Sequence, residues 1–343
     1  MFVSTIAEKL IVGFSMPNMP QCVIRYYIIF IVMTFSVTVL GSGSAKPTPN
    51  RHHSAHVLNV HEQFYLVDCG EGTQLQLLRV GINILKINAV FISHLHGDHI
   101  YGLFPLISSM GLMGRRVPLT IFAPAPFRDI IDFHFKYFDT ALPFEIIFHE
   151  VDTCSHQLIY QNTVMEVWSI PLRHRLPDAG FLFREKTPPL NVSKFAIERF
   201  GLGIAQIAAA KNGQDISIED GTLIPNEQIT YLPYSPRAYA YCSDTLFSAK
   251  AASLVSGADL IYHEATFASE DKALAQQTGH STAAQAATFA LKANAGKLLI
   301  GHFSSRYKDD SVLLTEAQSI FPNTETAVEL QSYPIAVKRN IHP

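Results

Sequence analysis

The sequence is poor in cysteine and contains no cysteine pair with metal-ligand or redox spacing. Its four cysteines, Cys22, Cys69, Cys154 and Cys242, are scattered over 343 residues. Closely spaced cysteines are typical of small secreted disulfide frameworks, and CxxC pairs are typical of zinc or redox sites. Their lack favours reduced thiols in a cytosolic protein. We therefore expect a cytoplasmic location and no cysteine in the functional site.

The sequence also has no excess of positive charge. Its formal net charge is -3, which does not indicate a nucleic-acid-binding protein, because global basicity is the usual electrostatic sign of phosphate recognition. Such a function is not excluded, since metal ions and a local basic patch can neutralise phosphate groups. With 48% hydrophobic residues the chain can bury a large core, which excludes a disordered or fibrous protein.

No apolar run is long enough to cross a membrane. The uncharged stretch that begins at Tyr26 alternates polar and apolar residues from Thr34 onward, which is the period of a strand. Its purely apolar part, Ile28–Val32, falls short of the roughly 20 residues of a spanning helix. We expect no membrane association, and residues 1–32 to be a tail or a mis-assigned start before a domain that begins at Met33. An export signal is the alternative.

A dense cluster of metal-competent residues follows the apolar run Ala89–Ile92. It reads His94-Leu95-His96-Gly97-Asp98-His99, three imidazoles and a carboxylate. These ligands suit zinc, iron or manganese. The alternating spacing lets His94 and His96 face one ion while Asp98 and His99 turn toward a second. The cluster predicts a two-metal hydrolytic centre at the end of a buried strand, and a polar loop with histidines by chance is the alternative.

The same pattern, an apolar run that ends at a polar residue, recurs along the chain. Val164–Ile170 leads to His174, Tyr239–Cys242 to Asp244, Leu260–Tyr262 to His263 and Glu264, and Leu298–Ile300 to His302. Runs rich in β-branched and aromatic residues fit buried strands, and we expect the ends of these strands to converge on one rim of a sheet.

Helix-like segments lie between the predicted strands. They are Ile100–Leu112, Phe127–Phe138 and Ala283–Ala293, the last capped by Ser281 or Thr282 and ended by Gly296. Alternating strands and helices support an α/β layered domain. The range 177–225 departs from this alternation and is predicted to be an insertion that binds or orients the substrate, with a surface excursion of no function as the alternative.

Taken together, these residues resemble the metallo-β-lactamase superfamily and, within it, the ribonuclease Z family. The resemblance spans about Met33 to Arg306. Elements shared with the superfamily are Asp68 in Val67-Asp68-Cys69-Gly70, the His94–His99 run, His174, Asp244 and His302. Elements similar to ribonuclease Z in order and spacing are Gly41–Pro49, Asp68–Gln74, His263–Phe267 and Gly279–Thr282.

The resemblance implies an α/β fold, the αββα four-layer metallo-β-lactamase sandwich with an inserted substrate-binding arm. The nuclease domain would occupy 33–310, with the arm at 177–225 and 311–343 as a C-terminal extension of the same domain. The implied activity is a zinc-dependent endoribonuclease that cleaves precursor tRNA at the 3′ side of the discriminator base. It leaves a 3′-hydroxyl on the tRNA and a 5′-phosphate on the trailer. Family members act as homodimers in which the arm of one subunit presents tRNA to the other.

The resemblance also implies roles for individual residues around two Zn²⁺ per subunit, with Mn²⁺ or Fe²⁺ as alternatives. One ion is assigned to His94, His96 and His174, and the other to Asp98, His99 and His302, with Asp244 bridging. Asp98 also accepts a proton, Glu264 orients His280 as general acid, and Asp68 orients ligands without binding metal. A helix-entry role is the alternative for His280.

The sequence departs from the family pattern at two places. Arg51-His52 stands where members often carry Arg-Asn, and the arm reads Phe200–Ala205 with Lys211 as its cation in place of a Gly-Pro-rich basic tip. Other two-metal enzymes of the superfamily, such as a phosphodiesterase, an arylsulfatase or a lactonase, are the alternative function. A catalytically inactive RNA-binding scaffold is a third, and the complete ligand set argues against it.

Overall fold

The computed structural model describes residues 33–138 and 142–340, so the expectation for residues 1–32 falls outside the described part. The chain forms two compact units, each with a seven-stranded sheet. The first extends to Glu150 and takes in Ala327–Ile335; the second comprises Val151–Thr326 and the residues from Ala336 onward. The segment that follows Thr326 thus contributes to both units.

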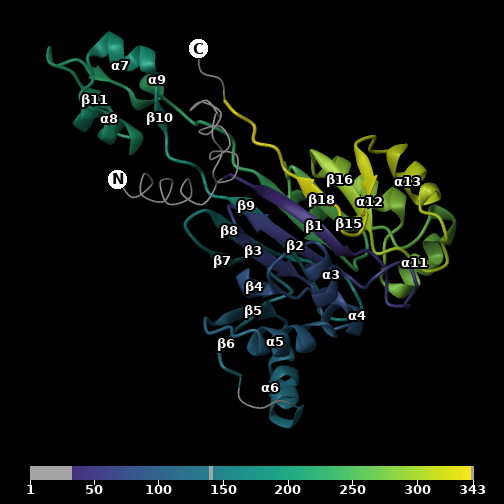
Figure 1. Ribbon diagram of the computed structural model, residues 1–343. Helices are drawn as coiled ribbons and strands as arrows, with labels where there is room; N and C mark the ends of the chain where they lie inside the picture. The colour runs from purple at the N-terminus through teal and green to yellow at the C-terminus, as the bar shows by residue number, and fades with distance from the viewer. Residues whose placement is uncertain (1–32, 139–141, 341–343) are drawn as a thin grey trace, which may run out of the picture. The chain divides into compact units, whose positions relative to one another are not determined.

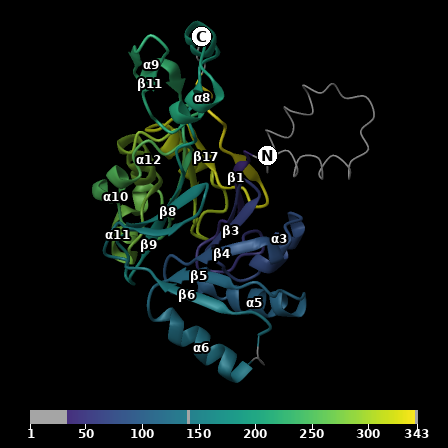
Figure 2. The ribbon, with the colours of Figure 1, turned by 90° about the vertical axis from the view of Figure 1, so that its left-hand side faces the viewer.

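The sheet of the first unit is mixed, with the order β18-β1-β2-β3-β4-β5-β6. Its strands are β1 (Phe35–Gly41), β2 (Ala55–Val60), β3 (Gln63–Val67), β4 (Ile87–Phe91), β5 (Leu119–Ala123), β6 (Ile146–Glu150) and β18 (Ser332–Pro334). Strands β3 to β6 are parallel and follow one another in Figures 1 and 2. Because parallel strands end at the same edge, Asp68 after β3 lies beside the histidine run after β4.

Helices α3 (Thr73–Arg79), α4 (Gly97–Ile100) and α5 (Leu103–Leu112) accompany this sheet. The single helix predicted over Ile100–Leu112 is interrupted in the structure, because α4 ends at Ile100 and α5 begins at Leu103. A Cβ on Gly102 would lie 1.9 Å from the carbonyl oxygen of Gly70, and the Gly102 amide donates to Cys69 O (2.9 Å). Gly102 therefore brings the start of α5 against the turn that follows β3.

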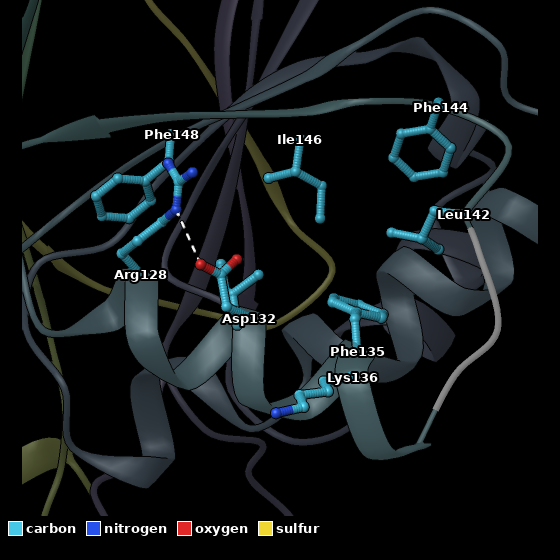
Figure 3. Close-up of a pocket in the computed structure, with 9 residues that line it drawn as sticks. Arg128, Asp132, Phe135, Lys136, Leu142, Phe144, Ile146 and Phe148 are labelled. Carbon is cyan, nitrogen blue, oxygen red and sulfur yellow. Dashed lines mark hydrogen bonds and ion pairs between the residues drawn. The ribbon is translucent and has the colours of Figure 1, made fainter.

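Helix α6 (Phe127–Phe138) matches its predicted bounds, and its Arg128 lies over the Phe148 ring of β6 (5.8 Å to the centroid). A cavity of about 410 Å³ lies between α6 and β6 (Figure 3). Its wall combines apolar side chains, such as Phe135 on the helix and Phe148 on the strand, with charged ones, among which Arg128 and Asp132 form an ion pair (3.2 Å). None of the predicted site residues is among those that line it.

The sheet of the second unit has the order β17-β16-β15-β14-β9-β8-β7. Its strands are β7 (Leu158–Gln161), β8 (Met165–Pro171), β9 (Ala179–Glu185), β14 (Ala238–Cys242), β15 (Leu260–Glu264), β16 (Lys297–Gly301) and β17 (Thr324–Thr326). Strands β14 to β17 are parallel. The helices are α10 (Ala249–Leu254), α11 (Lys272–Thr278), α12 (Ala283–Lys292) and α13 (Ser311–Gln318), and α12 packs on β15 and β16 (Figure 1).

The cap of α12 is Thr282, so the structure decides between the two predicted candidates. Thr282 Oγ1 accepts from the amide of Gln285, whose side chain accepts from the Thr282 amide, which forms a capping box. Ser281 instead donates to the carbonyl of Thr245 (2.5 Å). The helix ends at Lys292, before Gly296.

The predicted insertion overlaps a small helical excursion from the second sheet. Its elements are β10 (Asn191–Val192), α7 (Lys194–Phe200), α8 (Ile204–Lys211), β11 (Ile216–Ser217), β12 (Leu223–Ile224), α9 (Asn226–Ile229) and β13 (Thr230–Tyr231). They share a core that includes Leu202, Ile216 and Ile229. The first residues of the predicted range 177–225 include β9, which is a sheet strand. Within the described part of the chain, no helix is long and apolar enough to span a bilayer.

Candidate metal centre

The histidine run of the first unit forms a compact, buried group, the His94 cluster, made of His94, His96, Asp98 and His99. His94 follows β4, and the other three lie at the start of α4. The His94 Nε2 and His96 Nδ1 atoms are 2.9 Å apart, and Asp98 Oδ2 lies 3.5 Å from His99 Nε2. His94 and His99 are fully buried. The predicted pairs, His94 with His96 and Asp98 with His99, are therefore neighbours.

Asp68 supports this cluster from the adjacent strand end and is itself fully buried. Its Oδ2 accepts from His99 Nδ1 (2.7 Å) and from the hydroxyl of Ser93 (2.9 Å), and its Oδ1 accepts from the Ser93 amide (2.8 Å). Ser93 Oγ in turn lies 3.0 Å from His94 Nδ1. One carboxylate thus orients two imidazoles, one directly and one through a hydroxyl.

A second group, the Asp244 cluster, lies in the second unit and consists of His174, Asp244 and His302. These residues follow β8, β14 and β16. Asp244 Oδ1 is 3.1 Å from His302 Nε2, and Asp244 Oδ2 is 3.9 Å from His174 Nε2. Ser243 Oγ donates to Asp244 Oδ1 (2.8 Å). The carboxylate therefore lies between two imidazoles that come from different strand ends.

Four imidazoles of the two clusters have an oxygen atom as the partner of Nδ1. In His94, His99, His174 and His302 the Nδ1 atom has an oxygen partner, which is respectively Ser93 Oγ, Asp68 Oδ2, Gly279 O and Thr266 Oγ1. A donated Nδ1–H leaves the lone pair on Nε2, and ligating histidines in metalloproteins are oriented in this manner. Burial also lowers the pKa of His174, which keeps it in the neutral form that a metal requires. The donor set fits divalent metal ions.

Glu264 and His280 form a third element beside the Asp244 cluster. His280 Nδ1 is 3.0 Å from Glu264 Oε1, and Glu264 Oε2 accepts from Thr266 Oγ1 (2.5 Å). Burial alone would raise the pKa of Glu264, but His280 outweighs it and holds the pKa below its usual range. The His280 ring stacks on that of His302, with centroids 5.3 Å apart. An ionised Glu264 can thus orient His280 and stabilise its protonated form. Asp244, His280 and His302 are also close enough to share one ion, which is the competing role for His280.

Two residues of the Asp244 cluster, and Asp68 beside the His94 cluster, have backbone conformations that are unusual for residues other than glycine. Asp68, Asp244 and His302 have φ angles of 55°, 49° and 58°. Each follows a buried parallel strand, where a left-handed residue turns the chain sharply and aims its side chain at the end of the sheet. Such strained residues occur mostly at functional sites.

Sequence reasoning missed the hydroxyl residues of this network. Ser93 and Thr266 connect a carboxylate to a histidine in the His94 and Asp244 clusters respectively, and the amide of Thr245 donates to Glu264 Oε1 (2.6 Å). The available signal was position, since Ser93 precedes the histidine run and Thr266 lies inside the His263–Phe267 motif.

Comparison with known proteins places this geometry in a family. Residues 35–133 match a family model described as Anti-Pycsar protein Apyc1. Ribonuclease Z of Bacteroides fragilis is 42% identical over 295 residues, which cover 86% of this chain and 97% of that protein. Ribonuclease Z of Porphyromonas gingivalis is also 42% identical, with coverage of 86% and 97%.

Two solved structures share the fold. Human tRNase Z, short form, has a TM-score of 0.62 at 26% identity and covers 88% of this chain and 99% of its own. The metallo-β-lactamase fold protein YhfI of Bacillus subtilis has a TM-score of 0.60 at 19% identity and the same coverage.

The α/β fold with two mixed sheets is therefore that of the metallo-β-lactamase class, as the motifs predicted. Within this class the chain belongs to the ribonuclease Z family, given 42% identity to members over nearly their full length. The predicted family is confirmed.

Proposed function

We propose that the protein is a metal-dependent endoribonuclease that cleaves precursor tRNA at the 3′ side of the discriminator base. The products would be a tRNA with a 3′-hydroxyl and a trailer with a 5′-phosphate. The observation that carries this proposal is the 42% identity to ribonucleases Z over 86% of the chain. The buried His94 and Asp244 clusters support it, because they supply the imidazoles and carboxylates of a two-metal hydrolase.

His94, His96 and His174 would hold one ion and Asp98, His99 and His302 the other, and Asp244 would contribute to both. When bound, two divalent ions supply a nucleophile at neutral pH and neutralise charge on the phosphoryl oxygens. Zinc is the proposed metal, on the chemistry of a histidine-rich donor set. Asp98, which lies at the start of α4 and is 8% exposed, would accept the proton of the attacking water.

His280 is the proposed general acid. The leaving group is the 3′ oxygen of the tRNA, which departs poorly without a proton. With Nδ1–H donated to Glu264, the Nε2–H of protonated His280 is the atom available for this transfer. Glu264 stabilises the positive charge before transfer and is in turn held by Thr245 and Thr266. The chain's own contribution is thus a pre-oriented acid on a rigid scaffold.

Three further features are proposed: a homodimer, presentation of tRNA by the helical excursion, and a cytoplasmic location. The protein would form homodimers in which the excursion around α7 and α8 presents tRNA to the partner. In this chain Arg199 stacks on Phe200 (5.3 Å to the ring centroid), so an aromatic and cationic surface is available there. The free thiols of Cys69, Cys154 and Cys242 agree with a reducing cytoplasm.

The decisive experiment is incubation of purified, metal-analysed protein with a 3′-extended tRNA, with the cut mapped to the nucleotide. We expect one cut next to the discriminator base, abolished by a chelator and restored by zinc. Cleavage of a chromogenic phosphodiester without cleavage of the tRNA would instead support another phosphodiesterase of the superfamily. A protein that binds tRNA but contains no metal would support the scaffold alternative.

A further inference from the structure

Glu329 makes an unusually large number of hydrogen bonds for one carboxylate outside the metal clusters. It lies in Ala327–Ile335, the segment that returns to the first unit. Its Oε1 accepts from the amide of His52 (2.7 Å) and from the amide and hydroxyl of Ser42 (3.2 and 3.3 Å). Its Oε2 is 2.8 Å from His52 Nδ1 and accepts from Gln76 Nε2 (3.2 Å).

Ser42 and His52 are the two ends of one surface loop, residues 42–52, so Glu329 closes its neck. The Gly43 amide donates to His52 O (2.9 Å) at the same point. The neck is tight, because a Cβ on Gly41 would lie 1.7 Å from His53 O. The carboxylate thus fixes both ends of the loop from a distant part of the chain.

The tip of the loop is basic, exposed and stiff. Lys46 is exposed and Arg51 is partly exposed, and no acidic residue occurs between positions 42 and 52. Pro47 and Pro49 fix their φ angles, and Thr48 forms a bridge with Arg51. The loop therefore presents two cations on a backbone with little freedom.

The loop is also connected to the His94 cluster through the backbone. Ser54, two residues after the neck, accepts from the amide of Gly70 (3.1 Å), and Gly70 follows the turn that holds Asp68. A shift of the neck would therefore move the cations relative to the His94 cluster, which lies in the same unit.

We propose that Glu329 is a positioning residue for substrate binding, which holds loop 42–52 so that Lys46 and Arg51 contact phosphates of the tRNA. The proposal rests on the proposed function. The physical reason is preorganisation: a loop that is already ordered loses less conformational entropy when it binds. Glu329 touches no reacting atom, so its effect should fall on KM.

The direction of the change in tRNA binding when Glu329 is removed distinguishes a positioning role from a purely electrostatic one. Glu329 is an acid at the neck of a loop that carries two cations, which would face a polyanion. If it acted only through its charge, its removal would strengthen tRNA binding. If it positions the loop, its removal weakens binding although the local charge becomes more positive.

The test uses holoenzyme with Glu329→Gln and Glu329→Ala, and Glu325→Gln as a control for an exposed glutamate paired with Lys297. We expect KM for 3′-extended tRNA to rise roughly tenfold in Glu329→Ala and less in Glu329→Gln, which keeps an acceptor oxygen. The kcat for tRNA and the turnover of a chromogenic phosphodiester should stay within about twofold of the parent. The control should match the parent.

A double-mutant cycle identifies the route of the effect. Lys46→Ala with Arg51→Ala should raise KM and reduce the salt dependence of tRNA binding by about one phosphate contact per cation. In that background Glu329→Ala should add little, because the positioned cations are already absent. Full additivity, an unchanged KM, or a fall in turnover of the small diester would overturn the proposal. If the parent protein neither binds nor cuts tRNA, the proposed function fails instead.

Discussion

The His94 and Asp244 clusters contain the same kinds of ligand but are built in opposite ways. The His94 cluster takes its residues from one strand end and the first turn of α4, so its members are neighbours in the sequence. The Asp244 cluster collects residues from the ends of β8, β14 and β16. A local cluster depends on the conformation of one loop, whereas a distributed one depends on the register of a whole sheet. The difference shows how much of a metal centre a short motif can encode.

The clusters also differ in how their imidazoles are held. Asp68 serves both His94 and His99, and it does so from one buried strand end. In the Asp244 cluster each histidine has a separate partner, the carbonyl of Gly279 for His174 and the hydroxyl of Thr266 for His302. We therefore expect the His94 cluster to be sensitive to a single supporting residue and the Asp244 cluster to tolerate the loss of one.

The largest effect is expected from the carboxylates. Asp98→Asn should lower kcat for tRNA by about 10⁴-fold, because it removes both a ligand and the proposed proton acceptor. Asp244→Asn should cost about 10³-fold and lower the metal content, because it removes only a ligand. Steady-state kinetics and elemental analysis of both variants check this. Equal losses in both variants would contradict a separate proton-accepting role for Asp98.

The next effect concerns the acid beside the Asp244 cluster. His280→Ala should slow cleavage by roughly 10² to 10⁴-fold while the metal content stays that of the parent, since an acid is lost and no ligand. Glu264→Gln should lose part of this rate. Loss of one ion in His280→Ala would show instead that His280 is a ligand with Asp244 and His302. A substrate with an activated leaving group should be cleaved nearly as fast by the variant as by the parent.

A smaller effect, on metal affinity, distinguishes the support of two imidazoles by Asp68 from the support of one imidazole by Thr266. Asp68→Asn should weaken metal binding by up to about 100-fold, because it perturbs two imidazoles of its cluster. Thr266→Val should weaken it about tenfold, because His302 is the one imidazole of the Asp244 cluster that Thr266 contacts. Thr266→Ser keeps the hydroxyl and should restore the parent affinity. Competition with a chromogenic chelator measures this without reference to activity. A larger loss in Thr266→Val than in Asp68→Asn would reverse the proposed difference between the clusters.

The two clusters also mark what the sequence could and could not predict. The pairing of His94 with His96 followed from their spacing, because the cluster is local. The strand pattern predicted that the companions of Asp244 converge with it on one rim, but only family resemblance assigned them to particular ions. The register between distant strands cannot be read from either segment alone. Asp and His adopt a positive φ more often than most residues, but the surrounding structure decides where, so the positive φ of Asp68 and His302 was not predicted. The choice of Thr282 instead of Ser281 as the cap of α12 likewise depended on tertiary contacts, because Ser281 donates to the carbonyl of Thr245.

The smallest expected effect is on the pH dependence of stability. It is tested at two buried histidines, one in each unit. Burial lowers the pKa of His56 on β2 from 6.5 to about 3, and burial also lowers the pKa of His263 on β15. The unfolded chain binds a proton near pH 6.5 that folded His56 does not, so stability is complete above this pH and falls as the pH drops toward 3. The unfolding free energy changes by about 1.4 kcal/mol per pH unit, or roughly 2 kcal/mol between pH 6.5 and 5.

His56→Leu should therefore narrow the difference in unfolding free energy between pH 7 and pH 5 by roughly 2 kcal/mol, whatever its effect at pH 7. His263→Leu should narrow it in the same direction. Urea unfolding followed by circular dichroism measures both, and fluorescence of Trp168, the only tryptophan, reports the second unit. An unchanged pH dependence in His56→Leu would mean that burial does not lower the pKa of this histidine in the folded protein.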